Sequence, residues 1–73
     1  MANYIEITFL VTDTELQQVL IAQLSEEGFE GFEENESALK AFIPEGDYEK
    51  DKVQTIAEAH QVTFSATLIE SQN

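Results

Sequence analysis

The sequence of 73 residues contains no cysteine, no arginine and only three lysines. Without cysteine, disulfides and thiolate metal ligands are excluded, and small secreted domains usually depend on such bridges. No run of 18 apolar residues is present, and the first residues do not place a basic stretch before an apolar segment. We therefore expect a cytoplasmic protein with no membrane segment.

The scarcity of positive charge has a second consequence. Fifteen acidic residues against three lysines give a formal net charge of −12. A phosphate backbone would be repelled by this field, whereas a basic protein would be attracted. We expect no direct nucleic-acid binding and a basic protein as partner, the plainer alternative being that the acids only keep a small domain soluble.

The length allows one domain, because 73 residues can enclose only one modest hydrophobic core. With 42% apolar residues, the chain has enough apolar side chains to fold alone, as a marginally stable domain. We place this domain at residues 1–70 and interpret residues 71–73 as the start of a linker.

The first half of the chain predicts a strand followed by a helix. Residues 4–11 alternate in polarity, which favours a strand with one apolar face made by Ile5, Ile7, Phe9 and Val11. A capping box from Thr12 to Glu15 predicts the start of a helix over about 13–27, with Gly28 ending it and Phe29 folding back on the last turn. The predicted apolar stripe comprises Leu16, Val19, Leu20 and Leu24, with Ile21 at its edge.

The second half predicts a hairpin, a second helix and a last strand. Residues 30–35 and 38–43 would form the hairpin, whose acidic first arm suits a sheet edge. Asp47 is the predicted N-cap of a helix whose apolar stripe is Val53, Ile56, Ala57 and His60. Residues 61–70 alternate and predict a strand with Val62, Phe64, Ala66 and Leu68 on its apolar face.

The element order is thus β-α-β-β-α-β. With right-handed crossovers, this order predicts an α+β, ferredoxin-like domain: a four-stranded antiparallel sheet, in the order 4-1-3-2, with two helices on one face. The other face would be mostly polar. It would carry Glu6, Thr8, Lys40, Thr63, Ser65 and Thr67, together with Tyr4, Leu10, Phe42 and Ile69.

Residues with catalytic or ligand-binding chemistry are few. His60 is the single histidine, and we interpret it as a helix-end residue rather than a metal ligand. The glutamates at 26, 27, 30, 33, 34 and 36 lack the spacing of a calcium loop and are interpreted as a solvated rim. The glycines do not form a phosphate-binding loop. We assign no catalytic, cofactor-binding or metal residues to this chain.

Four stretches resemble the beginning of a ribosomal protein L11 methyltransferase: residues 4–9, 24–34, 41–44 and 69–73. The most specific of them are the Gly-Phe-Glu-Gly-Phe-Glu-Glu block over 28–34 and the Gln-Asn ending. The likeness covers nearly the whole chain. In that family a small ferredoxin-like N-terminal domain captures the ribosomal protein for a catalytic domain, which uses S-adenosylmethionine to methylate amino groups.

The resemblance implies that this chain is the substrate-recognition domain of a longer enzyme. S-adenosylmethionine and catalysis would then belong to a part of the parent that these residues do not include. Two other classes remain open: a free-standing small-molecule-binding or regulatory ferredoxin-like domain, and an acidic protein-interaction module. The chain is expected to be a monomer or a weak dimer.

The predicted contact surface is the hairpin arm from residue 30 to residue 36. Acidic side chains would form its rim, and Phe32 would be either an apolar anchor for the partner or part of the core. The partner-binding residues on this hypothesis are Glu30, Phe32, Glu33, Glu34 and Glu36.

Overall fold

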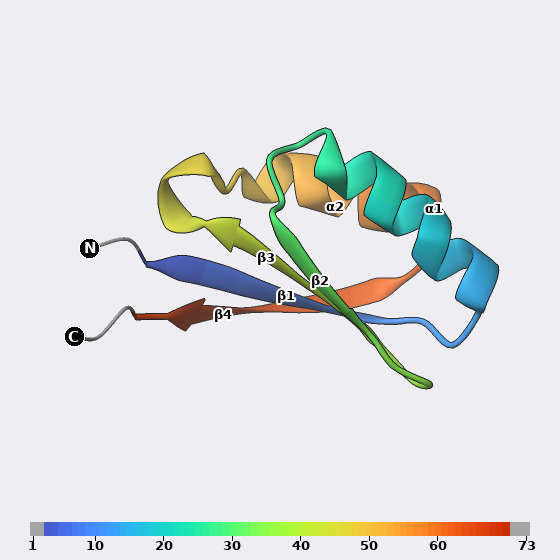
Figure 1. Cartoon of the computed structure of the whole chain (residues 1–73). Coiled ribbons are helices and arrows are strands. Elements are labelled where there is room, and N and C mark those ends of the chain that lie inside the picture. Colours follow the sequence, from blue (N-terminus) through green and yellow to red (C-terminus); the bar gives the residue numbers. More distant parts are fainter. Residues whose placement is uncertain (1–2, 71–73) are drawn as a thin grey trace.

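The computed structural model describes residues 3–70 as an α+β domain with one four-stranded antiparallel sheet and two helices. The strands are β1 (Tyr4–Leu10), β2 (Gly31–Glu34), β3 (Leu39–Pro44) and β4 (Thr63–Ile69), and the helices are α1 (Thr14–Ser25), α2 (Lys50–Ala59) and a short 3₁₀ helix η1 (Glu45–Asp47). Both α-helices cover the same face of the sheet (Figure 1). Neither helix within 3–70 is long and apolar enough to cross a membrane.

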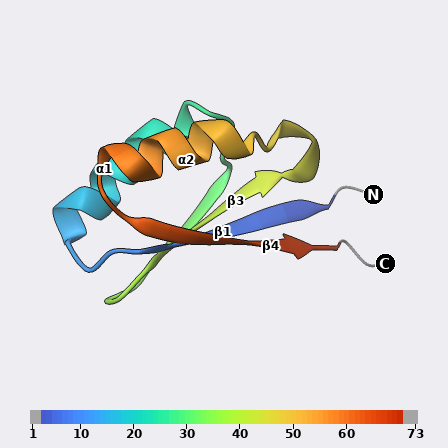
Figure 2. The same cartoon turned by 180° about the vertical axis from the view of Figure 1, so that it is seen from behind.

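The sheet has the order β2-β3-β1-β4, and every neighbouring pair is antiparallel. This is the predicted order read from the opposite edge, so the predicted fold class is confirmed. β2 and β4 are the two edge strands (Figure 2). β1 begins beside the end of β4, because Tyr4 is the cross-strand partner of Ile69. Residues 71–73, the predicted start of a linker, lie outside the described residues.

The core lies between the sheet and the helices. Alternation along β1 places Ile5, Ile7, Phe9 and the following Val11 in it, as predicted, and β3 contributes Leu39, Ala41 and Ile43. The helices add Leu20, Leu24, Val53 and Ala57. β4 behaves differently, because Phe64 packs against Phe9 at a ring-centroid distance of 5.8 Å whereas Ala66 and Leu68 are exposed. The predicted apolar face of the last strand is therefore half-buried where it begins and exposed beyond that point.

The stripe of α1 differs from the prediction at one position. Val19 is 42% exposed, whereas Gln17 is buried. With a rotation of about 100° per residue, Gln17 falls on the same face as Leu20 and Leu24, and Val19 points away from it. The prediction followed apolar residue types and therefore selected Val19.

Both predicted helix caps are wrong by one or two residues. The Asp13 carboxylate caps α1 by accepting hydrogen bonds from the amides of Glu15 and Leu16, at 2.9 and 3.3 Å, so Thr12 does not form a capping box. Asp47 lies in η1, and α2 is preceded by Glu49, which makes no side-chain cap. Pro44 fixes an extended backbone before η1, so the chain completes that turn before α2 begins.

The two helices end in the same kind of turn. After α1, Gly28 has a φ of +100°, the amide of Phe29 donates to the Leu24 carbonyl at 3.2 Å, and Phe29 is buried, as predicted. After α2, Gln61 has a φ of +58° and the amide of Val62 donates to the Ala57 carbonyl at 2.9 Å. Each turn reverses the chain toward an edge strand, β2 after α1 and β4 after α2.

Candidate functional site

The predicted contact surface forms a hairpin at one edge of the sheet. β2 pairs with β3 from Gly31 to Glu34, and the two strands are joined by a turn at Asn35. The Asn35 side-chain oxygen accepts hydrogen bonds from the amides of Ser37 and Ala38, at 3.2 and 2.9 Å. This is the turn chemistry that the Asn-Glu-Ser sequence predicts.

A buried glutamine of α1 holds this turn against the sheet. The Gln17 side-chain amide donates to the carbonyls of Val11 and Asn35 at 2.9 and 3.0 Å, and it lies 3.4 Å from the carbonyl of Ala38. These carbonyls belong to the segment after β1 and to both sides of the hairpin turn. Gln17 therefore supplies a donor to the carbonyls of Val11 and Asn35, whereas the Ala38 carbonyl also accepts from the Asn35 amide at 3.1 Å. Sequence reasoning missed this residue, although its spacing of three and seven from Leu20 and Leu24 was a usable signal.

The predicted acidic residues do not share one face. Glu33 faces the open side of the sheet opposite Lys40, whereas Glu34 pairs with Leu39 and therefore points to the helix side. There the Glu34 carboxylate accepts a hydrogen bond from Gln18 of α1 at 2.8 Å. Glu36 is exposed in the turn. The hairpin thus presents acids around its edge rather than as a flat patch.

Glu30 comes directly before β2 and is bonded to Tyr4, whose side chain lies on the open face of the sheet. The Tyr4 hydroxyl donates to the Glu30 carboxylate at 3.0 Å. This hydrogen bond, the negative charge of Glu30 and a small degree of burial raise the pKa of the Tyr4 phenol above its ordinary value of 10.0. The contact joins the beginning of β1 to the segment that enters β2.

Phe32 lies on the helix side of β2. It pairs in register with Ala41, which is buried, and its ring centroid is 6.5 Å from that of Phe29. The side chain is half-buried against the core. Its main contacts are therefore internal, and only its outer part is available at the sheet edge.

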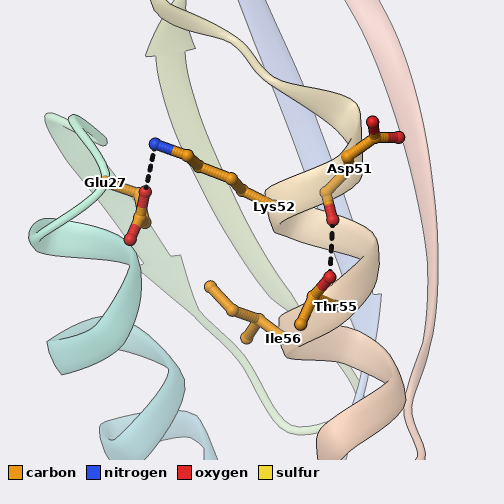
Figure 3. Close-up of a pocket in the computed structure, with 5 residues that line it drawn as sticks. All are labelled: Glu27, Asp51, Lys52, Thr55 and Ile56. Carbon is orange, nitrogen blue, oxygen red and sulfur yellow. Dashed lines mark hydrogen bonds and ion pairs between the residues drawn. The ribbon is translucent and has the colours of Figure 1, made fainter.

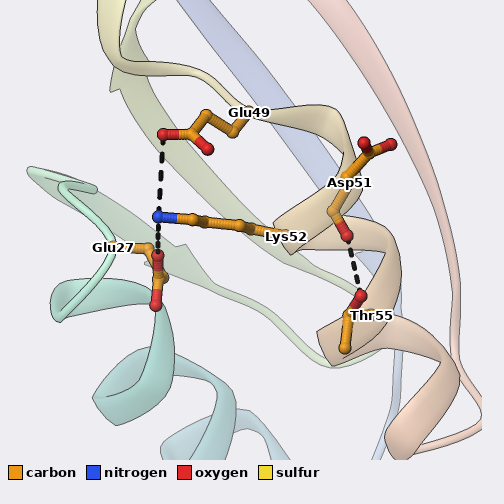
Figure 4. Close-up of polar contacts among 5 residues, drawn as sticks. All are labelled: Glu27, Glu49, Asp51, Lys52 and Thr55. Carbon is orange, nitrogen blue, oxygen red and sulfur yellow. Dashed lines mark hydrogen bonds and ion pairs between the residues drawn. The ribbon is translucent and has the colours of Figure 1, made fainter.

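Two of the three lysines are paired within the molecule. Lys40 lies 3.5 Å from the Glu6 carboxylate on the open face of the sheet. Lys52 of α2 lies between two carboxylates, 3.4 Å from Glu27 and 3.6 Å from Glu49 (Figure 4). Glu49 first, and then Glu27, raise the pKa of the Lys52 amine above its ordinary value of 10.5. A protonated amine between two acids is a structural link and a poor nucleophile.

An open cavity of about 310 Å³ lies beside this ion pair, between the end of α1 and α2 (Figure 3). Glu27, Asp51, Lys52, Thr55 and Ile56 line it. The Thr55 hydroxyl donates to the Asp51 carbonyl at 2.9 Å, so it is engaged within its own helix. The cavity combines one apolar side chain with four polar residues, of which Glu27, Lys52 and Thr55 already have bonding partners.

His60 lies at the C-terminal end of α2, as expected for a helix-end histidine. Its ring nitrogen Nε2 is 3.1 Å from the side-chain oxygen of Gln23 of α1. Over residues 3–70 the structure contains no group of three histidine, aspartate or glutamate side chains placed to hold a metal ion.

Two curated proteins are similar to this chain, and both are named ribosomal protein L11 methyltransferase. The protein from Chlorobaculum parvum is 36% identical over 64 residues and that from Chlorobaculum tepidum is 39% identical over 64 residues. Each match covers 88% of this chain but only 22% of the relative. No family model matches the chain, and no solved structure matches it.

The chain is thus similar to a fragment of ribosomal protein L11 methyltransferases. The resemblance found in the sequence is confirmed at that level. The chain spans about a fifth of the length of these relatives. A match over so small a share does not assign the whole activity of the relatives to this chain.

Proposed function

We propose that this domain recognises the substrate of an S-adenosylmethionine-dependent methyltransferase that acts on ribosomal protein L11. The observation that carries the proposal is the likeness of 64 residues to two L11 methyltransferases, combined with the small share of those proteins that the match covers. In such an enzyme, catalysis would belong to the larger part of the protein and a separate small domain would select the substrate.

The described residues do not fit S-adenosylmethionine. Methyltransferases of the resembled family hold it at a glycine-rich turn, and the glycines here lie after α1 (Gly28), in β2 (Gly31) and in η1 (Gly46). The N-terminus of α1 is occupied by its own cap, Asp13. We therefore propose that the cofactor and the catalytic residues belong to another part of the parent enzyme.

The acidic field supports a basic protein as partner. The net charge is −12, and Lys40 and Lys52 are both paired with glutamates. Opposite net charges accelerate encounter and orient the two proteins before they dock. On this proposal, the β2–β3 hairpin supplies the contact, with Glu33 and Glu36 exposed at its rim and the outer part of Phe32 beside them.

The test is titration of ribosomal protein L11 into the domain at two salt concentrations, followed by amide shifts in NMR spectra. We expect saturable shifts on the hairpin that weaken as salt is added, because exposed charges are screened. Glu33→Lys, and more strongly Glu33→Lys with Glu34→Lys, should lower both the affinity and its dependence on salt while the fold is retained.

Glu26→Lys is the matched control, because it makes the same change of charge on an exposed glutamate at the end of α1. It should lower the affinity less than Glu33→Lys does. Equal affinities of the wild-type domain and the Glu33→Lys, Glu34→Lys variant at low salt would remove the hairpin as the contact surface. Absence of any shift at low salt would count against substrate recognition by this domain alone.

A further inference from the structure

The second edge strand, β4, lacks the features that normally protect a sheet edge. It is seven residues long, Thr63–Ile69, and contains no charged residue, proline or glycine. Its register with β1 is unbroken from Thr63 to Ile69, so no bulge twists the edge away. Natural edge strands are usually shortened, charged or bulged, because an open edge pairs with other chains.

The outer edge of β4 is accessible. β1 is the strand neighbour of β4 within the described part of the chain, and every β4 residue except Phe64 is exposed. In an antiparallel pair the backbone groups of every second residue point away from the partner strand. β4 therefore offers a row of amides and carbonyls that an added strand can bond.

Side chains beside this edge would also gain from an added strand. On the helix side, Leu68 is 46% exposed next to Ile5, and the small side chain of Ala66 leaves room beside it. On the open side, Ile69 is 39% exposed. An extended segment with apolar residues at alternate positions would cover Ala66 and Leu68 on the helix side of the sheet.

The charges around β4 indicate which kind of segment fits. Lys52 and Ile56 of α2 face α1 (Figure 3), so helical spacing of about 100° per residue places Gln54 and Glu58 on the opposite flank, toward β4. Gln54 donates to Glu58 at 3.1 Å. Lys50 also falls on this flank, next to Asp51.

A second copy of the chain is a poor occupant, because each copy has a net charge of −12 and their fields repel. A positively charged segment is attracted by the same field that repels a second copy. It gains from the overall field and from Glu58, which oppose the like charge of Lys50, and the strand itself carries no charge.

We propose that β4 is a strand-addition site for an extended, basic polypeptide segment whose alternate residues are apolar. The proposal goes beyond the recognition role of the hairpin, since it concerns the opposite edge of the sheet and requires only a basic segment in extended form. Backbone hydrogen bonds along β4 supply the affinity, and alternate side chains over Ala66 and Leu68 supply the selectivity.

The probe is a short capped peptide that alternates valine with lysine and threonine. Binding is measured by calorimetry, and amide hydrogen exchange of the domain is followed by NMR. We expect slower exchange at alternate amides of residues 63–69 and unchanged exchange in β2. The same peptide with methyl groups on every second backbone nitrogen keeps the charge but loses the donors of one edge, so its affinity should fall by about tenfold or more.

Two variants separate strand addition from general attraction between charges. Thr67→Lys places a positive charge on β4, and Glu33→Lys makes a larger change of charge on the open face of β2. Both positions are exposed, so the fold should be retained, which circular dichroism checks. Strand addition requires Thr67→Lys to weaken peptide binding more than Glu33→Lys does.

Three results would overturn the proposal. Equal affinity for the N-methylated peptide would show that backbone bonding is not involved. Protection of β2 in place of β4 would assign the peptide to the hairpin. Protection of β4 that grows with protein concentration in the absence of peptide would show that the edge pairs with a second copy. Because the probe is a peptide and not ribosomal protein L11, failure here leaves the test of the proposed function intact.

Discussion

The two edges of the sheet differ in almost every respect. β2 has four residues, two of them glutamates, and its surroundings are bonded to the rest of the molecule through Gln17, Gln18 and Tyr4. β4 has seven residues, no charge, and one half-buried side chain, Phe64. A short acidic edge is protected against strand pairing by its charge, whereas a long uncharged one is open to it. A single sheet can thus offer a charged surface at one edge and a backbone surface at the other.

The largest effect should come from removing the buried amide that anchors the β2 side. Gln17→Ala leaves the carbonyls of Val11 and Asn35 without their donor, and we expect a loss of about 1–3 kcal/mol in the free energy of unfolding. Denaturation in urea measures it, and hydrogen exchange should show the hairpin opening before β4. Gln18→Ala removes one exposed hydrogen bond to Glu34 and should change stability by less than about 0.5 kcal/mol. Similar losses in both variants would mean that Gln17 is no anchor.

A smaller effect should distinguish the two turns that lead into the edge strands. Gly28→Ala puts a β-carbon on a residue with a φ of +100° and should cost about 1–2 kcal/mol. Gln61→Gly relieves the steric strain of a positive φ in the turn before β4. It should stabilise the domain by at most about 1 kcal/mol, because glycine also loses more entropy on folding. Thermal denaturation measures both changes.

Gly46→Ala is the control for these turn variants. Gly46 has no positive φ, and nothing lies within 4 Å of an added β-carbon, so the change should be within about 0.5 kcal/mol of neutral. Destabilisation by Gln61→Gly would show that the strain in the turn into β4 is smaller than the entropy that glycine loses on folding.

The smallest effect concerns pH. The raised pKa of Tyr4 means that folding favours its neutral, protonated form. The raised pKa of Lys52 means that folding favours its charged, protonated form. Both contributions are therefore complete below the ordinary values of 10.0 and 10.5 and disappear as pH rises through the higher values of the folded protein. Stability should decline slightly above pH 10. Glu30→Ala removes both the hydrogen-bond acceptor and the negative charge that raise the pKa of Tyr4, and an unchanged phenol titration in that variant would contradict the assignment.

Much of the fold could be predicted because its signals are periodic. Alternation defined β1 and β4, and the turn signal at Asn35 defined the β2–β3 hairpin. Gly28 with Phe29 defined the end of α1 by a backbone conformation that glycine adopts readily. The errors arose where two residues compete for one role. Thr12 and Asp13 both suit an N-cap, and only the backbone geometry decides between them. Gln17 was missed because a polar residue enters a core only when tertiary structure supplies its partners.

The candidate site was located in the sequence but not resolved into faces. The hairpin lies where the glutamates and the turn at Asn35 indicated. Glu33 and Glu34 are neighbours in a strand and therefore point to opposite faces, but which of them faces the helices depends on the register with β3. The contrast between Phe32, packed on Phe29, and exposed Leu68 has another origin, because both lie on the helix side of the sheet and the helices cover one part of that face more than another.

The pairing of Tyr4 with Ile69 also determines how the domain responds to force. β1 and β4 are antiparallel neighbours, and β1 begins where β4 ends (Figure 1). A load applied at these two points pulls across the ladder, so the cross-strand bonds break one after another instead of sharing the load. The domain should therefore unzip at low tension, with β4 leaving first and the β2–β3 hairpin still folded against α1.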